Sequence, residues 1–409
     1  MLKNGLPIHD NSFHVTAHQK GVIDDLQILR GWAILFVLFW HLQMNKATRP
    51  IVPEEFSAWL RFNTGVDLFF AISGFVIARS FLPVFYATPR IKKRFSIVSE
   101  FWIRRAFRLF PSAWSWAISI IIGGFVFSTS TRWGVFEDNL KGALSVFFHY
   151  ANYFASQNQW NTGPFNIYWS LSLEEQFYIC LPLLGLATGR PIGLAISLII
   201  AIGVRLWNPL PIMAIWYRYE GMALGVLLAM AQMYLAPYYA RLEPKFLSAP
   251  ALRLFTFITL VAGMVLCASP KTAKLLGVNF LDLHFLVAVF AILIVFIASF
   301  DRDYLAPPGI LKSLMLWIGA RSYALYLCHI IVLFFVVDGM TFMGLYHNDS
   351  TAARMLVVCV SIPLMFWLAD QNFKIIEQPL NAYGKKLTKR LSTTSDHVSH
   401  SEQQKRLVK

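Results

Sequence analysis

The chain is dominated by long apolar runs that are interrupted by prolines, glycines and clusters of charge. A helix needs about 20 apolar residues to cross a bilayer, and ten runs come close to that length. We therefore predict ten membrane-spanning helices, at residues 26–45, 63–81, 111–129, 166–187, 191–206, 216–236, 252–269, 281–300, 314–337 and 354–375. A weaker eleventh candidate at 141–156 is followed by polar residues, so we interpret it as an external or re-entrant segment.

The composition supports this prediction. Hydrophobic residues make up 56% of the 409 residues and charged residues only 14%, whereas soluble proteins carry about 25% charged residues. Disordered chains are poor in apolar residues, so that class is excluded as well. We expect an all-α polytopic membrane protein of about ten transmembrane helices. Its parts would be a cytoplasmic N-terminal segment at 1–25, a membrane domain at 26–376 and a flexible, basic cytoplasmic tail at 377–409.

The net charge of +14 is distributed unevenly along the chain. If the N-terminus is inside, Lys and Arg favour the cytoplasmic loops over the outer loops by roughly three to one, as the positive-inside rule expects. This predicts that both termini are cytoplasmic. Nucleic-acid binding is not expected, because the basic residues do not gather on a soluble face. The basic residues 92–94 are expected to contact anionic membrane lipids, and the four cysteines, all in apolar runs, indicate neither disulfides nor a metal site.

Two ionisable residues of the first span lie on one helix face. Arg30 and His41 are about 20° apart around the helix and about 16 Å apart along it. A guanidinium near the cytosol suits a phosphate, and an imidazole in apolar surroundings stays neutral and can accept a proton. We expect both side chains to line a shared tunnel. A snorkelling arginine and a histidine bonded to a neighbouring helix fit the spacing equally well.

The fourth span contains two adjacent glutamates, which are costly inside an apolar helix unless they are paired or neutral. Glu174 lies at a depth similar to that of His41, so the two side chains could be in contact. Ser170, one helical turn away, could bond to Glu174. The alternative is a buried carboxyl group that only fixes helix packing.

Further polar residues accompany the other spans. Arg105 and Arg108 lie three residues apart on one helical face and could hold a polyphosphate, or they could simply set the topology. Other candidates for substrate binding, each of which could instead satisfy a neighbouring helix, are Asp67, Ser73, Tyr323 and His329.

Taken together, these stretches resemble the acyltransferase-3 family of integral membrane acyltransferases. The resemblance rests on Arg30 and His41 with ten residues between them, and on segments 65–75, 104–111, 169–178, 322–329 and 377–379. Each motif is weak by itself, but six motifs in order across residues 25 to 380 are specific.

The resemblance implies transfer of an acyl group, usually acetyl, from cytoplasmic acyl-CoA to a hydroxyl. The acceptor is usually a bacterial surface glycan, such as O-antigen or an exopolysaccharide, in free or lipid-linked form. The implied location is the bacterial inner (plasma) membrane, with several membrane passes. His41 is implied as the catalytic position and Arg30 as its essential partner. Arg105 and Arg108 match the cytoplasmic arginine motif, and Glu174 matches a motif carboxylate.

Our hypothesis is that neutral His41 acts as a general base on the acceptor hydroxyl, with a covalent acyl-histidine as the variant. Glu174 would orient His41 or stabilise its imidazolium, or it would instead bind acceptor hydroxyls. Two other functions stay open at this point. One is a glycan-lipid or small-molecule transporter without acyl chemistry, although no repeat relates the first five spans to the last five. The other is an acyltransferase that uses the same residues on a non-glycan small molecule.

Overall fold

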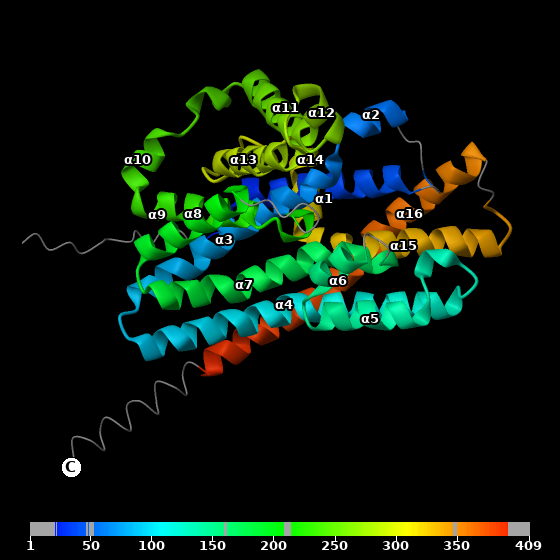
Figure 1. Cartoon of the computed structure of the whole chain (residues 1–409), viewed down its shortest axis with the longest axis horizontal. Coiled ribbons are helices and arrows are strands. Elements are labelled where there is room, and N and C mark those ends of the chain that lie inside the picture. The colour runs from blue at the N-terminus through cyan, green and yellow to red at the C-terminus, as the bar shows by residue number, and fades with distance from the viewer. Residues whose placement is uncertain are drawn as a thin grey trace, which may run out of the picture.

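The computed structural model describes residues 21, 23–45, 48, 53–158, 162–207, 214–346 and 350–391. Most of the predicted segment 1–25 and the last part of the predicted tail, 392–409, lie outside the described residues. Figure 1 shows a bundle in which long helices such as α4, α7 and α15 run along the longest axis of the molecule. The α-helices are α1 (Asp24–Met44), α2 (Glu54–Trp59), α3 (Gly65–Ala87), α4 (Ile91–Val126), α5 (Phe136–Phe147), α6 (Ala151–Gln157), α7 (Tyr168–Thr188), α8 (Pro191–Trp207), α9 (Glu220–Tyr234), α10 (Ala236–Arg241), α11 (Pro250–Cys267), α12 (Pro270–Leu276), α13 (Phe280–Ala298), α14 (Ile310–Ala320), α15 (Ser322–Phe342) and α16 (Thr351–Asn372).

The all-helical prediction is confirmed for the described residues, which contain no β-strand. Six helical stretches are long and apolar enough to cross a bilayer, namely Asp24–Met44, Phe62–Ala87, Ile91–Val126, Pro250–Cys267, Ser322–Phe342 and Thr351–Leu391. Three shorter helices are also apolar, at Pro191–Trp207, Asp282–Ala298 and Ile310–Ala320. These helices support a multi-pass membrane protein. The count of ten spans and the side on which the termini lie stay predictions.

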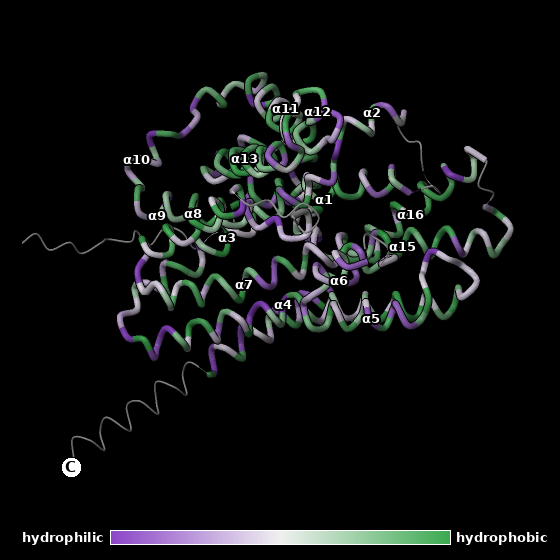
Figure 2. The backbone as a smooth tube through the Cα atoms, viewed as in Figure 1, coloured by the Kyte–Doolittle hydropathy of each residue, from purple (hydrophilic) through white to green (hydrophobic). Residues whose placement is uncertain are grey.

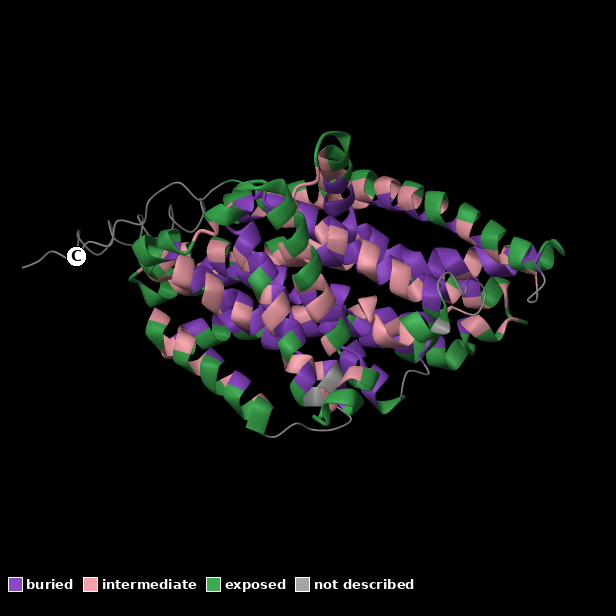
Figure 3. Cartoon of the chain, turned by 90° about the horizontal axis from the view of Figure 1, so that it is seen from above, coloured by how far each residue is buried: buried purple, intermediate pink, exposed green. Residues whose placement is uncertain are grey.

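Large apolar side chains are exposed on the outside of the bundle, as expected for a surface that faces lipid. Figure 2 shows hydrophobic residues along most of the helices, and Figure 3 shows buried residues concentrated in the middle of the bundle. On α8 and α11 the large side chains of Ile199, Ile200, Leu254 and Phe255 are all exposed. Helices satisfy their own backbone hydrogen bonds, so such faces can contact hydrocarbon at no polar cost.

Glycines bring the central helices into close contact. A Cβ atom on Gly74 of α3 would lie 2.0 Å from the carbonyl oxygen of Met222 on α9, and one on Gly225 would lie 2.4 Å from the carbonyl oxygen of Ala71. Real atoms cannot approach that closely, so neither position accepts a side chain without a shift of the backbone. Small residues at helix contacts are typical of membrane bundles, where close backbone packing replaces the hydrophobic effect.

The predicted span 314–337 corresponds to two helices. α14 ends at Ala320 and α15 begins at Ser322, with Arg321 between them. The Arg321 guanidinium lies 4.2 Å from the ring centroid of Trp317, and its Nε donates a 2.6 Å hydrogen bond to the carboxylate of Asp370 on α16. Apolar segments flank Arg321 and Ser322 on both sides, so the hydropathy pattern merged the two helices into one predicted span.

The last helix extends further than the sequence indicated. It runs from Thr351 to Leu391 as one helical stretch, with a π-helical segment at Phe373–Glu377. Residues 377–391 were expected to belong to a flexible tail, but they form a helix that packs against the first half of α4. The ring centroids of Phe107 and Tyr383 are 5.3 Å apart, and Arg104 Nε donates to Thr388 Oγ1 at 3.1 Å.

Candidate active site

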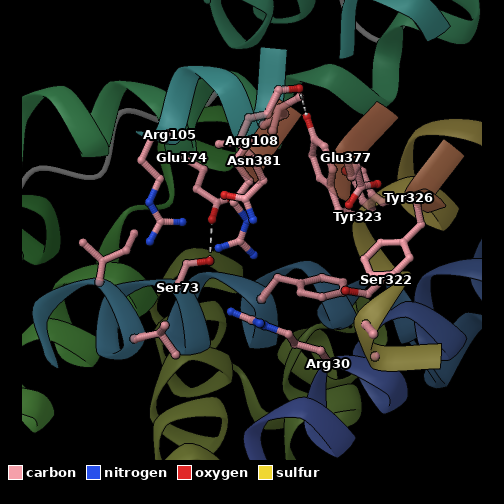
Figure 4. Close-up of a pocket in the computed structure, with 18 of the residues that line it drawn as sticks. Arg30, Ser73, Arg105, Arg108, Glu174, Ser322, Tyr323, Tyr326, Glu377 and Asn381 are labelled. Carbon is pink, nitrogen blue, oxygen red and sulfur yellow. Dashed lines mark hydrogen bonds between the residues drawn. The ribbon is translucent and has the colours of Figure 1, made fainter. Parts of the chain in front are cut away.

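A cavity of about 810 Å³ lies between α1, α3, α4, α7, α14, α15 and the C-terminal helix. This volume is typical of a small-molecule or cofactor site. Figure 4 shows arginines from α1 and α4 and tyrosines from α15 around it. Seven predicted site residues are among those that line the cavity: Arg30, Ser73, Arg105, Arg108, Ser170, Glu174 and Tyr323. Its lining residues do not include His41, Asp67 or His329.

Three guanidinium groups share this cavity. Arg30 donates to the side-chain oxygen of Gln27 at 3.3 Å, and the Arg105 guanidinium lies 5.1 Å from the ring centroid of Tyr178. Among the described residues, no carboxylate forms an ion pair with Arg30, Arg105 or Arg108. Keeping positive charge in an apolar bundle is costly. The arrangement is therefore suited to an anionic ligand that neutralises the three arginines together.

The Glu174 carboxylate is fixed in the cavity wall by two hydroxyl groups. Ser73 Oγ and Tyr178 Oη both donate to Glu174 Oε1, and both residues also line the cavity. The interpretation that Ser170 bonds to Glu174 was wrong, because the Ser170 hydroxyl lies 2.6 Å from that of Tyr326. The adjacent Glu175 faces elsewhere and pairs with His149. Consecutive residues point about 100° apart around a helix, so the two neighbouring carboxyl groups have different partners.

The hydrogen-bond partner of His41 is another histidine, not Glu174. His41 Nδ1 lies 2.9 Å from the carbonyl oxygen of Val37 and 3.2 Å from Nε2 of His329 on α15. The two rings are 4.8 Å apart between centroids. His329 is fully buried, whereas His41 is partly exposed. The expectation that Glu174 orients His41 is therefore replaced by a contact between α1 and α15.

The carbonyl groups around this pair define where the protons lie. His329 Nδ1 is 2.7 Å from the carbonyl oxygen of Tyr326, which can only accept a hydrogen bond. With both rings neutral, His329 Nδ1 therefore carries the proton and its Nε2 is an acceptor. His41 Nδ1 faces this acceptor and the Val37 carbonyl, so it must be the donor. The second nitrogen of His41, Nε2, is left with its lone pair and is the atom that can take up a proton.

Tyr326 connects the histidine pair to the cavity. It lines the cavity, and its ring centroid is 5.8 Å from that of His329. Its hydroxyl donates to the carbonyl oxygen of Ile167 at 2.9 Å. The expectation that Arg30 and His41 line a shared tunnel was therefore wrong for His41. Arg30 lines the cavity, while His41 lies behind Tyr326 and His329.

This geometry can be set beside known proteins. A family model described as an acyltransferase domain matches residues 23–370. That match covers most of the chain and includes every predicted site residue. The chain belongs to this acyltransferase family. No solved structure matches the chain.

Three curated relatives of the chain come from bacteria. The peptidoglycan O-acetyltransferase OatA of Listeria monocytogenes is 23% identical over 90% of this chain and 57% of its own length. The O-acetyltransferase OatA of Staphylococcus aureus is 24% identical over 87% of this chain and 57% of its own length. The putative peptidoglycan O-acetyltransferase YrhL of Bacillus subtilis is 30% identical over 42% of this chain and 25% of its own length. The chain therefore spans little more than half the length of the first relatives.

The C-terminal helix supplies a wall of the cavity that the sequence analysis did not assign. The side chains of Glu377, Asn381 and Lys385 line it. The π-helical segment ends at Glu377, whose carboxylate accepts a 2.9 Å hydrogen bond from Asn372. π-Helical segments are rare and often lie at functional sites. Segment 377–379 was one of the motifs of the resemblance, so a signal was present, but it carried no role.

Asp67 belongs to a different cluster of buried charge. Its carboxylate accepts from Arg218 Nη1 at 3.1 Å and lies 3.8 Å from His284 Nε2. The Arg218 guanidinium also lies 5.0 Å from the ring centroid of Trp169. Because Asp67 does not line the cavity and has a cationic partner in Arg218, it fits the alternative of a residue that satisfies neighbouring helices.

Proposed function

We propose that this protein is a membrane O-acyltransferase that moves an acyl group, most simply acetyl, from acyl-CoA to a hydroxyl of a cell-envelope glycan. The observation that carries the proposal is the cavity itself. It contains three arginines without carboxylate partners in the described part of the chain, and it ends beside a histidine pair that leaves one imidazole nitrogen free to act as a base.

The charges in the cavity support acyl-CoA as the donor. Arginine binds phosphate oxygens through several hydrogen bonds at once, so Arg30, Arg105 and Arg108 would hold the phosphates of acetyl-CoA. Its pantetheine arm would then lead the thioester toward Tyr326. The C-terminal helix and the first half of α4 carry many basic residues, which supports a cytoplasmic location for this end. Both termini would then be cytoplasmic, in a bacterial inner membrane.

In the proposed reaction, His41 is the general base. His41 Nε2 takes the proton of the acceptor hydroxyl while the hydroxyl oxygen attacks the thioester carbonyl carbon. The carbon–sulfur bond breaks, and the departing thiolate takes the proton from His41 to give free CoA. His329 is a positioning residue, because its Nε2 accepts from His41 Nδ1 and holds the ring in the required tautomer. A covalent acyl-histidine is the variant of this mechanism.

The acceptor would reach His41 by a different route from the donor. His41 is partly exposed but is not a lining residue of the cavity, so donor and acceptor can meet at the reacting atoms from two sides. The three relatives described above carry peptidoglycan or O-acetyltransferase in their names, which makes peptidoglycan the first acceptor to test. O-antigen and exopolysaccharide are the next.

The test uses the full chain in proteoliposomes, with acetyl-CoA labelled in the acetyl group and peptidoglycan fragments as acceptor. We expect alkali-labile label on the glycan, as an ester requires. His41→Ala should lower the transfer rate by about 10³-fold, within the range of general-base catalysis, while calorimetry shows unchanged binding of CoA. Equal transfer by the variant would contradict the role of His41. If the wild-type protein transferred no label to any of the three glycans, the proposed function would be wrong.

A further inference from the structure

Two hydroxyl groups from different helices meet at the end of the cavity next to the histidine pair. Ser170 on α7 and Tyr326 on α15 both line the cavity, and their hydroxyl oxygens are 2.6 Å apart. Both side chains are otherwise buried. In Figure 4, Tyr326 lies on the opposite side of the cavity from Arg105. This hydroxyl pair therefore lies in the wall where a thioester would arrive if its phosphates were bound by the arginines.

The pair can rearrange its hydrogen bonds. Its two hydroxyl protons can satisfy the partner hydroxyl and one backbone carbonyl, that of Ile167. This carbonyl is 2.9 Å from the Tyr326 oxygen but 3.5 Å from the Ser170 oxygen, which is at the limit of a hydrogen bond. In the arrangement with the Tyr326 proton on the Ile167 carbonyl, Ser170 donates to Tyr326. If Tyr326 instead gives up that 2.9 Å bond and donates to Ser170, the Ser170 proton keeps only the long contact. It can then turn toward a stronger acceptor in the cavity.

Acyl transfer creates such an acceptor. When the acceptor oxygen attacks the thioester, the carbonyl oxygen becomes an oxyanion, and donors placed at that oxygen stabilise the transition state. Among the lining residues, the arginines would be occupied by phosphates, and Glu174 offers negative charge, which would repel an oxyanion. The Ser170–Tyr326 pair offers neutral hydroxyl donors. The hydroxyl pair is next to the histidine pair, because the ring centroids of Tyr326 and His329 are 5.8 Å apart.

We propose that the Ser170–Tyr326 pair forms the oxyanion-binding site of the transferase, with a hydroxyl of the pair donating a hydrogen bond to the thioester carbonyl oxygen. This inference rests on the proposed function. The carbonyl oxygen gains negative charge as the new carbon–oxygen bond forms. It returns that charge when the carbon–sulfur bond breaks and thiolate leaves. No proton leaves the pair at any point, since its hydrogen bonds only change partner.

A purely structural role for the pair makes a different prediction. A hydrogen bond that only held α7 and α15 together would contribute to the stability of the fold. It would not bind the transition state more tightly than the bound donor. Removing an oxyanion donor instead lowers kcat by about 10²–10³-fold and leaves ground-state binding unchanged. Because both hydroxyls serve one hydrogen-bond chain, losing the second after the first should cost little more.

The test compares Tyr326→Phe, Ser170→Ala and the double variant with two matched controls in the same transfer assay. Tyr168→Phe removes another buried tyrosine hydroxyl, which donates to the Ala113 carbonyl at 3.2 Å, and Ser172→Ala removes another serine hydroxyl of α7. Neither control residue lines the cavity. Measured quantities are kcat with acetyl-CoA, the dissociation constant of CoA and the midpoint of thermal unfolding.

We expect each single variant and the double variant to lose about 10²-fold in kcat, with CoA affinity within twofold of wild type and both controls within threefold in kcat. Two results would overturn the inference. One is kcat within threefold of wild type for Tyr326→Phe and Ser170→Ala. The other is a loss of activity matched by an equal loss of CoA affinity or by unfolding. An inactive wild-type protein would instead contradict the proposed function, so the two failures are distinguishable.

Discussion

The molecule contains two clusters of buried charge that differ in how the charges are paired. In the first, Arg218 and His284 surround the Asp67 carboxylate, and the nearby Arg205 lies 3.1 Å from Glu220. In the second, the three arginines of the cavity face one another without a carboxylate in ion-pair contact among the described residues. The first cluster holds cations and carboxylates together in the folded chain. The second leaves a surplus of positive charge around a space that a ligand can fill.

Intramembrane charge by itself therefore does not identify a site. From the sequence, Arg30 and Asp67 were both candidate binding residues, and each had a structural alternative. Only their partners separate them. A paired charge that lines no cavity is most simply explained by helix packing, whereas an unpaired charge in a cavity requires a ligand. The following variants test this distinction.

The largest effect is expected for Arg218→Leu, measured as the free energy of unfolding in detergent. Removing one partner of a buried ion pair leaves the Asp67 carboxylate under-compensated, which typically costs 3–5 kcal/mol, so we expect a loss of about 3 kcal/mol. The matched control is Arg302→Leu, whose ion pair with Glu243 at 3.1 Å is 63% exposed on the arginine side. Exposed pairs contribute less than about 1 kcal/mol. Equal losses for both variants would remove the distinction between the clusters.

Arg105→Leu should show the opposite behaviour. We expect CoA to bind about 30-fold more weakly, because a charge-assisted hydrogen bond contributes about 2 kcal/mol, while the free energy of unfolding stays unchanged or increases. The neighbouring Arg104→Leu is the control, since Arg104 is exposed, pairs with Glu100 at 2.8 Å and does not line the cavity. If Arg105→Leu destabilised the fold and left CoA affinity unchanged, the cavity arginines would be structural like Arg218.

The smallest effect concerns the wall that the C-terminal helix contributes. Lys385 lines the cavity and is exposed, whereas its neighbour Lys386 is exposed but not a lining residue. A solvated lysine near a phosphate contributes less than about 1 kcal/mol, so Lys385→Ala should weaken CoA binding about threefold. Lys386→Ala should leave the affinity unchanged. Isothermal titration at low and high salt would show the Lys385 effect fade as salt screens the charge; equal affinities for both variants would exclude this wall from donor binding.

The sequence alone was enough to identify Arg30, Arg105 and Arg108 as candidate site residues. Their spacing placed each on a definite helix face, and the acyltransferase resemblance added roles. Other features were not accessible in this way. The break at Arg321 depends on its contacts with Asp370 and Trp317, and the hydrogen bond between His41 and His329 joins residues that are 288 positions apart. Periodicity along one helix contains no information about which helix lies beside it.

The amino-acid sequence determined that this protein is helical and apolar on its outside. A chain in hydrocarbon must satisfy its backbone hydrogen bonds locally, and the length of each apolar run sets where helices form. The tertiary structure decided which polar side chains share a cavity and which neutralise one another. That outcome depends on lateral packing, set here by close glycine contacts between α3 and α9 and by the π-helical segment that brings Glu377 to the cavity wall.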